Sequence, residues 1–283
     1  MARAVIPEAE EILDKPFPVL DKGFLRLVDY MGGDERIVQS ARVSYGKGTK
    51  SFREDRGLIR YLMRNRHTSP FEQVVLTFHA KMPVFVARQW VRHRTARLNE
   101  ISGRYSVMQD EFYLPDPQQV SYQSSSNRQG RGETLPESEA QRIIDSMRRR
   151  QQEAYATYEE LLEAGVAREL SRVNLPLSMY TEWYWQIDLN NLFHFLDLRL
   201  DPHAQYEIRK YAEVMFEVAK AVCPLACEAF EDFMLYGETF SRQESAVLRM
   251  LVAELGADRL ETAAREAGLS ERERERFGAK LTE

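Results

Sequence analysis

The segment from residue 89 to residue 105 concentrates positive charge. It reads QWVRHRTARLNEISGRY and holds Arg92, His93, Arg94, Arg97 and Arg104. A guanidinium presents paired N–H donors that match phosphate oxygens, so several of them at one place can bind a polyanion. Ser102 adds a hydroxyl donor, and Gly103 lets backbone amides approach a ligand. The segment predicts an anion site or, on spacing alone, a solvated basic surface balanced by nearby acids.

Apolar neighbours favour the ligand site. The cluster is flanked by Trp90, Val91, Leu98 and Ile101. These residues would hold the segment against a core. Four further polar residues, taken singly, are more typical of structure or surface than of chemistry: His67, His194, Arg172 and Arg199.

Composition limits the class of protein. The chain has 283 residues, 43% of them hydrophobic, and a formal net charge of -5. That apolar content suffices for a sizeable core, and the charge offers no general attraction to nucleic acid or to an anionic membrane. No apolar run approaches the roughly 20 residues that span a bilayer. The acidic residues among the first 15 do not suit a secretory signal. We therefore expect a cytoplasmic protein with no nucleic-acid or membrane partner.

Sulfur chemistry is not expected. Cys223 and Cys227 are too few for a disulfide framework and short of the ligands of a zinc site, so we expect two small buried side chains and no metal. Neither thiol has the electropositive setting that would lower its pKa. Ser102 has no evident base to activate it, so it is interpreted as a phosphate ligand rather than a nucleophile.

The elements that must position these residues follow from the apolar period. It changes between helix-like and strand-like, which predicts an α/β fold of the α+β type, a mixed sheet flanked by helices. Strands are expected at 24–30, 74–80 and 180–187. Helices are expected at 34–44, 54–64, 84–92, from a capping box at Thr134 and Glu137 to Gly165, and at 205–222. Residues 119–133 predict a polar loop without order of its own.

The tail differs from the rest of the chain. Capping-box pairs at Ser241 with Glu244 and at Ser270 with Glu273, and stops at Gly256 and Gly268, predict two or three short helices. Their layout is similar to a helix-turn-helix, but eight basic and nine acidic residues from 241 onward do not make a DNA-binding face. We expect domains at 1–236 and 237–283, the second a packing or oligomerisation accessory.

Residues 92–102, RHRTARLNEIS, fit the pattern Arg-His-Arg, seven residues, Ser, and GRY follows directly. This resembles the flavin-dependent thymidylate synthases. Further blocks occur in the order of that family: ARVSYG at 41–46, HTSPFEQ at 67–73, TFHAKMPVFVARQW at 77–90, EFYLP at 111–115, LPLSMYTEWYW at 175–185 and FLDLRLDPHAQYEIR at 195–209. The resemblance covers roughly 21–234 and makes 1–236 the catalytic domain. No counterpart to the tail is expected.

The resemblance implies a reaction. A methylene group passes from 5,10-methylenetetrahydrofolate to C5 of deoxyuridine monophosphate (dUMP), and FAD, reduced by NADPH, supplies the hydride that completes the methyl group of dTMP. The family forms homotetramers whose active sites are shared between subunits. Its thiol-independent route is consistent with the setting of the two cysteines.

The resemblance also assigns residues by position. The dUMP site comprises Gln89, Trp90, Val91, Arg92, Glu100, Ile101, Ser102, Gly103, Arg104, Arg172 and Arg199. Within it, Arg172 would come from a neighbouring subunit, and Arg199 would be catalytic, because a fixed cation beside uracil N3 and O2 stabilises negative charge there. The FAD site comprises Ser69, Arg92, His93, Arg94, Glu100, Asp188, Leu189, Asn190 and His194, with His67 near flavin or folate.

Two departures from the family pattern concern the FAD diphosphate. Asp188 to Asn190 stand where Asn-x-Arg is frequent, and a carboxylate beside a diphosphate is unfavourable unless it faces the ribose. Arg97 stands where a small residue is usual and is the candidate replacement. Two other functions remain alternatives: an RNA- or nucleotide-binding module that stacks bases on Trp90 and Tyr105, and a flavoprotein oxidase without methyl transfer.

Overall fold

The computed structural model describes residues 5–43, 52–125 and 130–282. It divides into two compact units, Met1–Tyr236 and Gly237–Glu283. Some predictions lie outside the described residues. These are residues 44–46 of the block ARVSYG, the end of the helix expected at 34–44, and residues 126–129 of the expected loop.

The first unit is built on a five-stranded sheet in the order β1-β2-β3-β7-β4, with every pairing antiparallel, where a mixed sheet was predicted. The strands are β1 (Phe17–Val19), β2 (Gly23–Met31), β3 (Val75–Pro83), β7 (Tyr180–Asp188) and β4 (Arg97–Glu100). The three predicted strands are confirmed as β2, β3 and β7. Strand β4 was not predicted: all four of its residues are exposed, so no apolar alternation marks it, and it pairs with β7 at the sheet edge.

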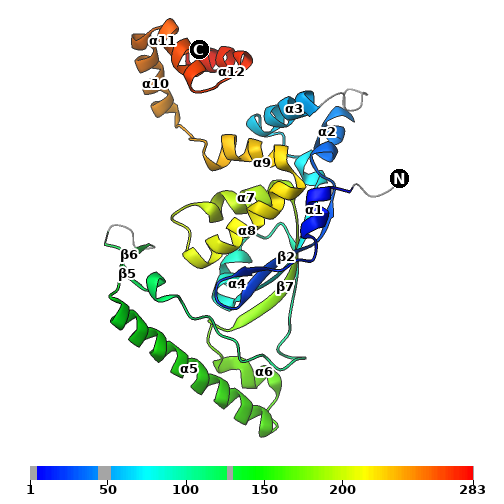
Figure 1. Ribbon diagram of the computed structural model, residues 1–283, viewed down its shortest axis with the longest axis vertical. Coiled ribbons are helices and arrows are strands. Elements are labelled where there is room, and N and C mark those ends of the chain that lie inside the picture. Colours follow the sequence, from blue (N-terminus) through cyan, green and yellow to red (C-terminus); the bar gives the residue numbers. More distant parts are fainter. Residues whose placement is uncertain (1–4, 44–51, 126–129, 283) are drawn as a thin grey trace. The chain divides into compact units, whose positions relative to one another are not determined.

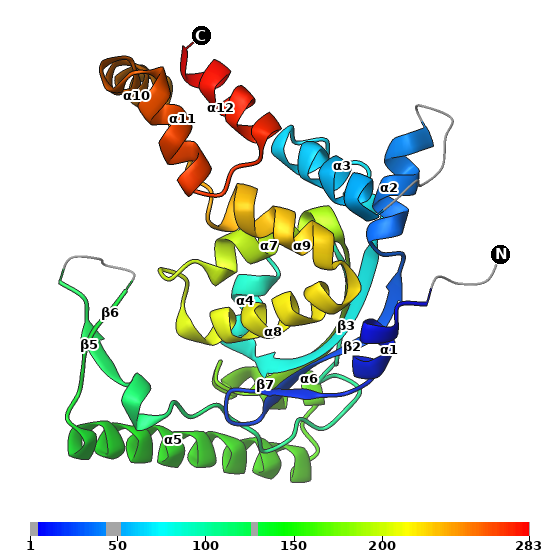
Figure 2. The ribbon, with the colours of Figure 1, turned by 45° about the horizontal axis from the view of Figure 1, so that its top comes forward.

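Helices lie on both sides of this sheet, but they cover only one of its faces; on the other face Tyr184 of β7 is 43% exposed (Figures 1 and 2). On the covered side lie α4 (Val84–Trp90), α7 (Leu189–Leu200) and α8 (Tyr206–Val222), and on the other side α5 (Glu137–Glu163) and α6 (Arg168–Ser171). Alternate residues of β3 and β7 are buried with the first group, among them Phe78, Trp183 and Trp185. The period of two in these strands therefore places the core between the sheet and α4, α7 and α8.

The same unit contains further helices and turns. They are α1 (Pro7–Ile12), α2 (Asp34–Arg42), α3 (Phe52–Arg64), α9 (Pro224–Phe230), the 3-10 turns η2 (Phe71–Gln73), η3 (Pro117–Gln119) and η4 (Arg172–Asn174), and the π-helical turn η5 (Glu231–Leu235). Helix α5 ends before Gly165 as predicted, but its predicted capping box is wrong. Pro136 is the N-cap, because Thr134 is held in a strand opposite Ser121.

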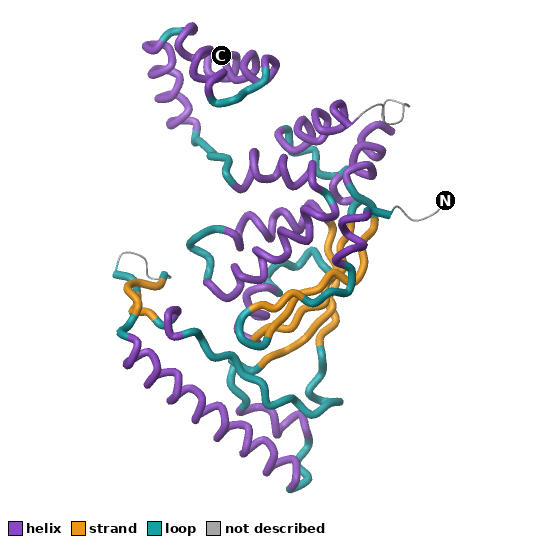
Figure 3. Tube along the Cα trace, in the orientation of Figure 1, coloured by secondary structure: helices purple, strands orange, loops and turns teal. Residues whose placement is uncertain are grey.

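The polar segment 119–133 is more ordered than predicted. Strands β5 (Ser121–Gln123) and β6 (Arg131–Thr134) form a hairpin (Figure 3). Contacts from outside supply the order that its own apolar surface lacks. Leu135, next to β6, is buried, and Arg131 binds both Gln119 and the carboxylate of Glu207.

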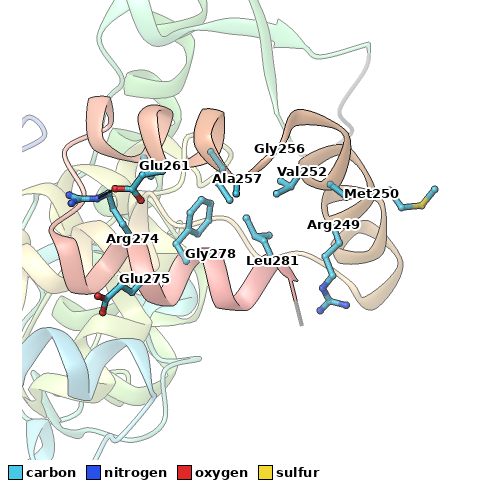
Figure 4. A pocket seen from close by; sticks show the side chains of 14 residues that line it. Arg249, Met250, Val252, Gly256, Ala257, Glu261, Arg274, Glu275, Gly278 and Leu281 are labelled. Atoms are coloured by element: carbon cyan, nitrogen blue, oxygen red, sulfur yellow. Dashed lines mark hydrogen bonds and ion pairs between the residues drawn. The ribbon is translucent and has the colours of Figure 1, made fainter.

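The second unit consists of α10 (Arg242–Leu255), α11 (Ala257–Glu266) and α12 (Glu271–Thr282). The capping box at Ser241 and Glu244 is confirmed. Gly256 and Gly268 adopt φ values of +87° and +84°, which favour glycine where a helix stops. The helices enclose a pocket of about 640 Å³ lined by Ala257, Leu260, Phe277 and Leu281, among others (Figure 4).

Cys223 and Cys227 are free thiols in the core, as predicted, and burial raises the pKa of both. Across the described residues, no helix is both long and apolar enough for a membrane span.

Candidate functional site

The basic segment and α7 form a first cluster. Helix α4 ends at Trp90, and the turn after it carries Arg92 and His93. Arg199, in the last turn of α7, donates a hydrogen bond from Nε to Nε2 of His93 over 3.1 Å. The His93 ring packs edge-on against Phe195, with 4.8 Å between ring centroids. The cluster therefore joins two segments that are 106 residues apart.

The electrostatics of this cluster keep the positive charge on the arginines. Burial lowers the pKa of His93 to about 4, and the charge of Arg199 and the neighbouring His194 add to the effect. Burial, followed by the charge of Arg92, lowers the pKa of Arg199, but a guanidinium stays protonated in proteins. His93 is thus neutral at physiological pH, and its Nε2 lone pair can accept the bond from Arg199.

Neutral His93 makes stability depend on pH. Its pKa falls from the ordinary 6.5 to about 4 on folding, so the unfolded chain binds more protons between these values. This contribution to stability is fully present above pH 6.5 and is lost as pH falls toward 4. We expect His93→Gln, whose amide oxygen accepts without titrating, to reduce the decline in unfolding free energy across that window. Denaturant titrations at pH 4.5 and 7.5 measure it, and an equal decline in both proteins would contradict the assignment.

A second cluster lies at the other end of β4. The backbone N–H of Arg104 donates to Ser102 Oγ over 3.3 Å, and its guanidinium pairs with Glu169 of α6 at 3.1 Å. Gly103 is buried, and a Cβ built on it would lie 3.1 Å from Cδ of Arg172. A side chain at position 103 would therefore press against Arg172.

Within this chain Arg172 lies next to Gly103, on the same side of β4 as Ser102 and Arg104. Its predicted contribution to the site of a neighbouring subunit stays a prediction. The residues expected to bind dUMP thus form two groups, one with Arg92 and Arg199 and one with Gly103 and Arg172. The spacing of residues along the sequence cannot show this division, because Arg172 reaches Gly103 only through the packing of α6 and η4.

Several arginines of both clusters have no carboxylate partner within the described part of the chain: Arg92, Arg94, Arg172 and Arg199. In a chain with a net charge of -5, acids are available to pair with them. Exposed Arg92 and Arg94 and half-buried Arg199 therefore present guanidinium groups to an anion from outside the chain.

Two predicted site residues belong to the core instead. Trp90 is 0% exposed and packs against Trp183 and Trp185, so its side chain cannot touch a nucleotide or stack on a base. Leu189 is also 0% exposed, and its backbone N–H donates to the carbonyl of Val74. Both are apolar residues next to motif residues. The sequence alone therefore does not distinguish them from the residues that bind a ligand. Val91 and Ile101 are exposed at 37% and 44%.

The residues predicted to hold FAD fit an anionic, flat cofactor in part. His67, Ser69 and His194 are exposed, as are Arg92 and Arg94. Asp188 is different: its carboxylate caps α7, accepting from the backbone N–H of Asn191 at 2.9 Å and from its side-chain amide at 2.7 Å. Because Asp188 caps α7 and residues 188–190 include no cation, phosphate binding is left to the arginines.

The proposed substitute for the missing cation is also engaged. Arg97 donates from Nη1 to Oε1 of Gln186 over 3.4 Å, a weak bond that leaves its charge unneutralised. Glu100, at the end of β4, accepts from the hydroxyl of Thr181 over 2.6 Å.

The sequence did not predict two polar residues that are connected to Gln89 by hydrogen bonds. The side-chain amide of Gln89 donates to Gln205, which in turn donates to Glu207. The signal was present in the block DPHAQYEIR, but no pattern indicates that this block lies beside α4.

Comparison with known proteins identifies the family. The family described as thymidylate synthase complementing protein matches residues 26–225. A protein of Treponema denticola named flavin-dependent thymidylate synthase is 60% identical over 95% of this chain and 98% of its own. The chain belongs to the flavin-dependent thymidylate synthase family.

A second relative and a solved structure show how far the similarity extends. A Gluconobacter oxydans flavin-dependent thymidylate synthase is 52% identical over 99% of this chain and 92% of its own. The crystal structure of a UMP/dUMP methylase, PolB of Streptomyces cacaoi bound with 5-Br dUMP, superposes with a TM-score of 0.71 at 34% identity, over 77% of this chain and 99% of its own. The α+β fold is confirmed. The tail has a counterpart in the Gluconobacter relative, contrary to prediction.

Proposed function

We propose that this chain is a flavin-dependent thymidylate synthase that converts dUMP to dTMP, with 5,10-methylenetetrahydrofolate as carbon donor and NADPH as reductant. Identity of 52% to 60% with relatives of that name over nearly the whole chain supports the activity and the FAD cofactor. The structural observation that carries the proposal is the group of arginines without carboxylate partners, held at the RHR motif and at η4.

Arg199 is the catalytic residue of the proposal. Its Nε is bound to His93, and no other described residue takes a hydrogen bond from this guanidinium, so Nη1 and Nη2 are left for the substrate. Placed beside N3 and O2 of the uracil ring, this fixed charge stabilises the negative charge that develops when C5 becomes nucleophilic. Reduced FAD, when bound, supplies the hydride. His93, Arg92 and Arg94 of this chain orient or bind, and none of them needs to transfer a proton to the ring.

The two clusters support a shared active site. Each contains only part of a nucleotide site. In the first, Gln89 lies on α4, Arg92 in the turn after it and Arg199 on α7; in the second, Ser102 and Gly103 follow β4 and Arg172 lies in η4. We infer that the first group of one subunit meets the second group of another, within a homotetramer. Measurement of the mass of the assembly by light scattering tests this part. Cytoplasmic residence belongs to the same proposal, and the two free thiols suit a reducing compartment.

Purified protein tests the activity directly. We expect a yellow preparation whose flavin absorbance bleaches with NADPH and returns when methylenetetrahydrofolate and dUMP are added together. Tritium release from C5-labelled dUMP, with label-free dTMP as product, distinguishes methyl transfer from a simple oxidase. Colourless protein that retains oligonucleotide with steep salt dependence would instead support a nucleic-acid-binding module.

A further inference from the structure

A chain of hydrogen bonds runs from Gln89 to a buried carboxylate. Nε2 of Gln89 donates to Oε1 of Gln205, and Nε2 of Gln205 donates to Oε2 of Glu207 over 2.8 Å. Glu207, in the first turn of α8, is 2% exposed. Its other oxygen accepts from the hydroxyl of Tyr113, over 2.9 Å, and from the guanidinium of Arg131. The chain thus connects α4, α8 and the β5–β6 hairpin.

The carboxylate fixes the direction of every bond in this relay of Gln89, Gln205 and Glu207. An ionised carboxylate accepts hydrogen bonds and donates none, so Gln205 must turn its NH2 group toward Glu207. The carbonyl oxygen of Gln205 then faces Gln89 and can only accept. Gln89 must therefore turn its own NH2 group toward Gln205. The carbonyl oxygen of Gln89, which has no partner among the described residues, remains to accept from a ligand.

We propose that Gln205 and Glu207 are positioning residues that present the carbonyl oxygen of Gln89 to a hydroxyl or N–H group of the nucleotide. This rests on the proposed function, because Gln89 is assigned to the dUMP site. A phosphate dianion has no proton to donate, so the carbonyl oxygen of Gln89 accepts a hydrogen bond from the sugar or the base. The arginines bind the phosphate. Hydrogen bonds from Arg131 and Tyr113 hold the buried carboxylate of Glu207 in place.

Removal of the carboxylate from the relay tests the proposal. Glu207→Gln keeps a carbonyl oxygen for Tyr113 and Arg131 and turns an NH2 group toward Gln205. Gln205 must then flip, and Gln89 offers NH2 instead of a carbonyl oxygen to the nucleotide. We expect the Kd for dUMP, measured by calorimetry on the flavin-loaded protein, to rise about tenfold, the effect of one lost hydrogen bond and a mismatched donor. Flavin content should not change.

The double variant Glu207→Gln with Gln205→Glu swaps the carboxylate and the amide and restores the direction of the hydrogen bond from Gln89. A carboxylate at position 205 accepts from both neighbours, so Gln89 turns its NH2 group inward again, and net charge equals that of the wild type. We expect the Kd to return to within about threefold of wild type. The buried carboxylate that Arg131 binds is still missing from this variant. A purely structural role for Glu207 therefore predicts no recovery.

Controls separate the possible failures. Glu217→Gln removes a carboxylate whose side chain is 72% exposed on the same helix, and it should leave the Kd unchanged. Should Glu207→Gln not fold, Gln205→Leu breaks the relay at an exposed position and should weaken dUMP binding to a similar extent. Unchanged affinity in either variant, or no recovery in the swap, overturns the relay. A wild-type protein that binds flavin but not dUMP overturns the proposed function instead.

Discussion

Arg199→Ala is expected to lower kcat for dUMP methylation by about a thousandfold while the protein keeps its flavin. The side chain of Arg199 is half-buried beside Arg92, where water screens its field less than at the surface. The bond to His93 orients it before substrate arrives, so little reorganisation is needed as charge develops on the ring. The measurements are tritium release from C5-labelled dUMP and the flavin-to-protein absorbance ratio.

The interpretation of Arg199→Ala depends on two comparisons. Arg259→Ala, which removes an exposed guanidinium from α11, should leave turnover unchanged. Arg199→Lys keeps the charge but loses both the planar donor pair and the Nε bond to His93, so we expect intermediate activity. Turnover at the wild-type rate in Arg199→Ala would remove this residue from the catalytic role, whereas loss of flavin would point to a structural defect.

Trp90→Ala is expected to reduce the free energy of unfolding by roughly 3–5 kcal/mol. The indole is fully buried and contacts Trp183, Trp185, Phe195 and Tyr211, with ring centroids 5.2–5.8 Å apart. Truncation removes apolar contact with β7, α7 and α8 at once. It would also loosen the end of α4, which carries Gln89 and Arg92 into the site, so affinity for dUMP should fall together with stability.

A conservative change at the same position is the matched control. The indole Nε1 is buried without a hydrogen-bond partner among the described residues, so Trp90→Phe sacrifices no hydrogen bond. It should cost clearly less stability than alanine. Denaturant unfolding followed by circular dichroism measures both variants, and equal losses for Phe and Ala would show that packing volume is not what Trp90 contributes.

The limits of prediction from sequence are clearest along the edge of the sheet. The strands β3 and β7 were predictable because one face of each is buried, which imposes a period of two on the residues. Strand β4 was not, because all four of its residues are exposed and it is held by backbone pairing with β7. The hairpin at 121–134 escaped prediction for a similar reason: the carboxylate that holds Arg131 belongs to α8.

The sequence by itself determined the family and predicted the chemistry of the site, because the RHR motif and the serine and glycine after it lie within 17 residues and need no long-range contact to be recognised. Only the tertiary structure decided that His93 holds Arg199, that Arg172 lies against Gly103 of its own chain, and that Trp90 is core. The physical reason is that each of these depends on which donor meets which acceptor, or which surface is covered, when remote segments pack on one sheet. Local periodicity encodes the faces of helices and strands but not the partners they find.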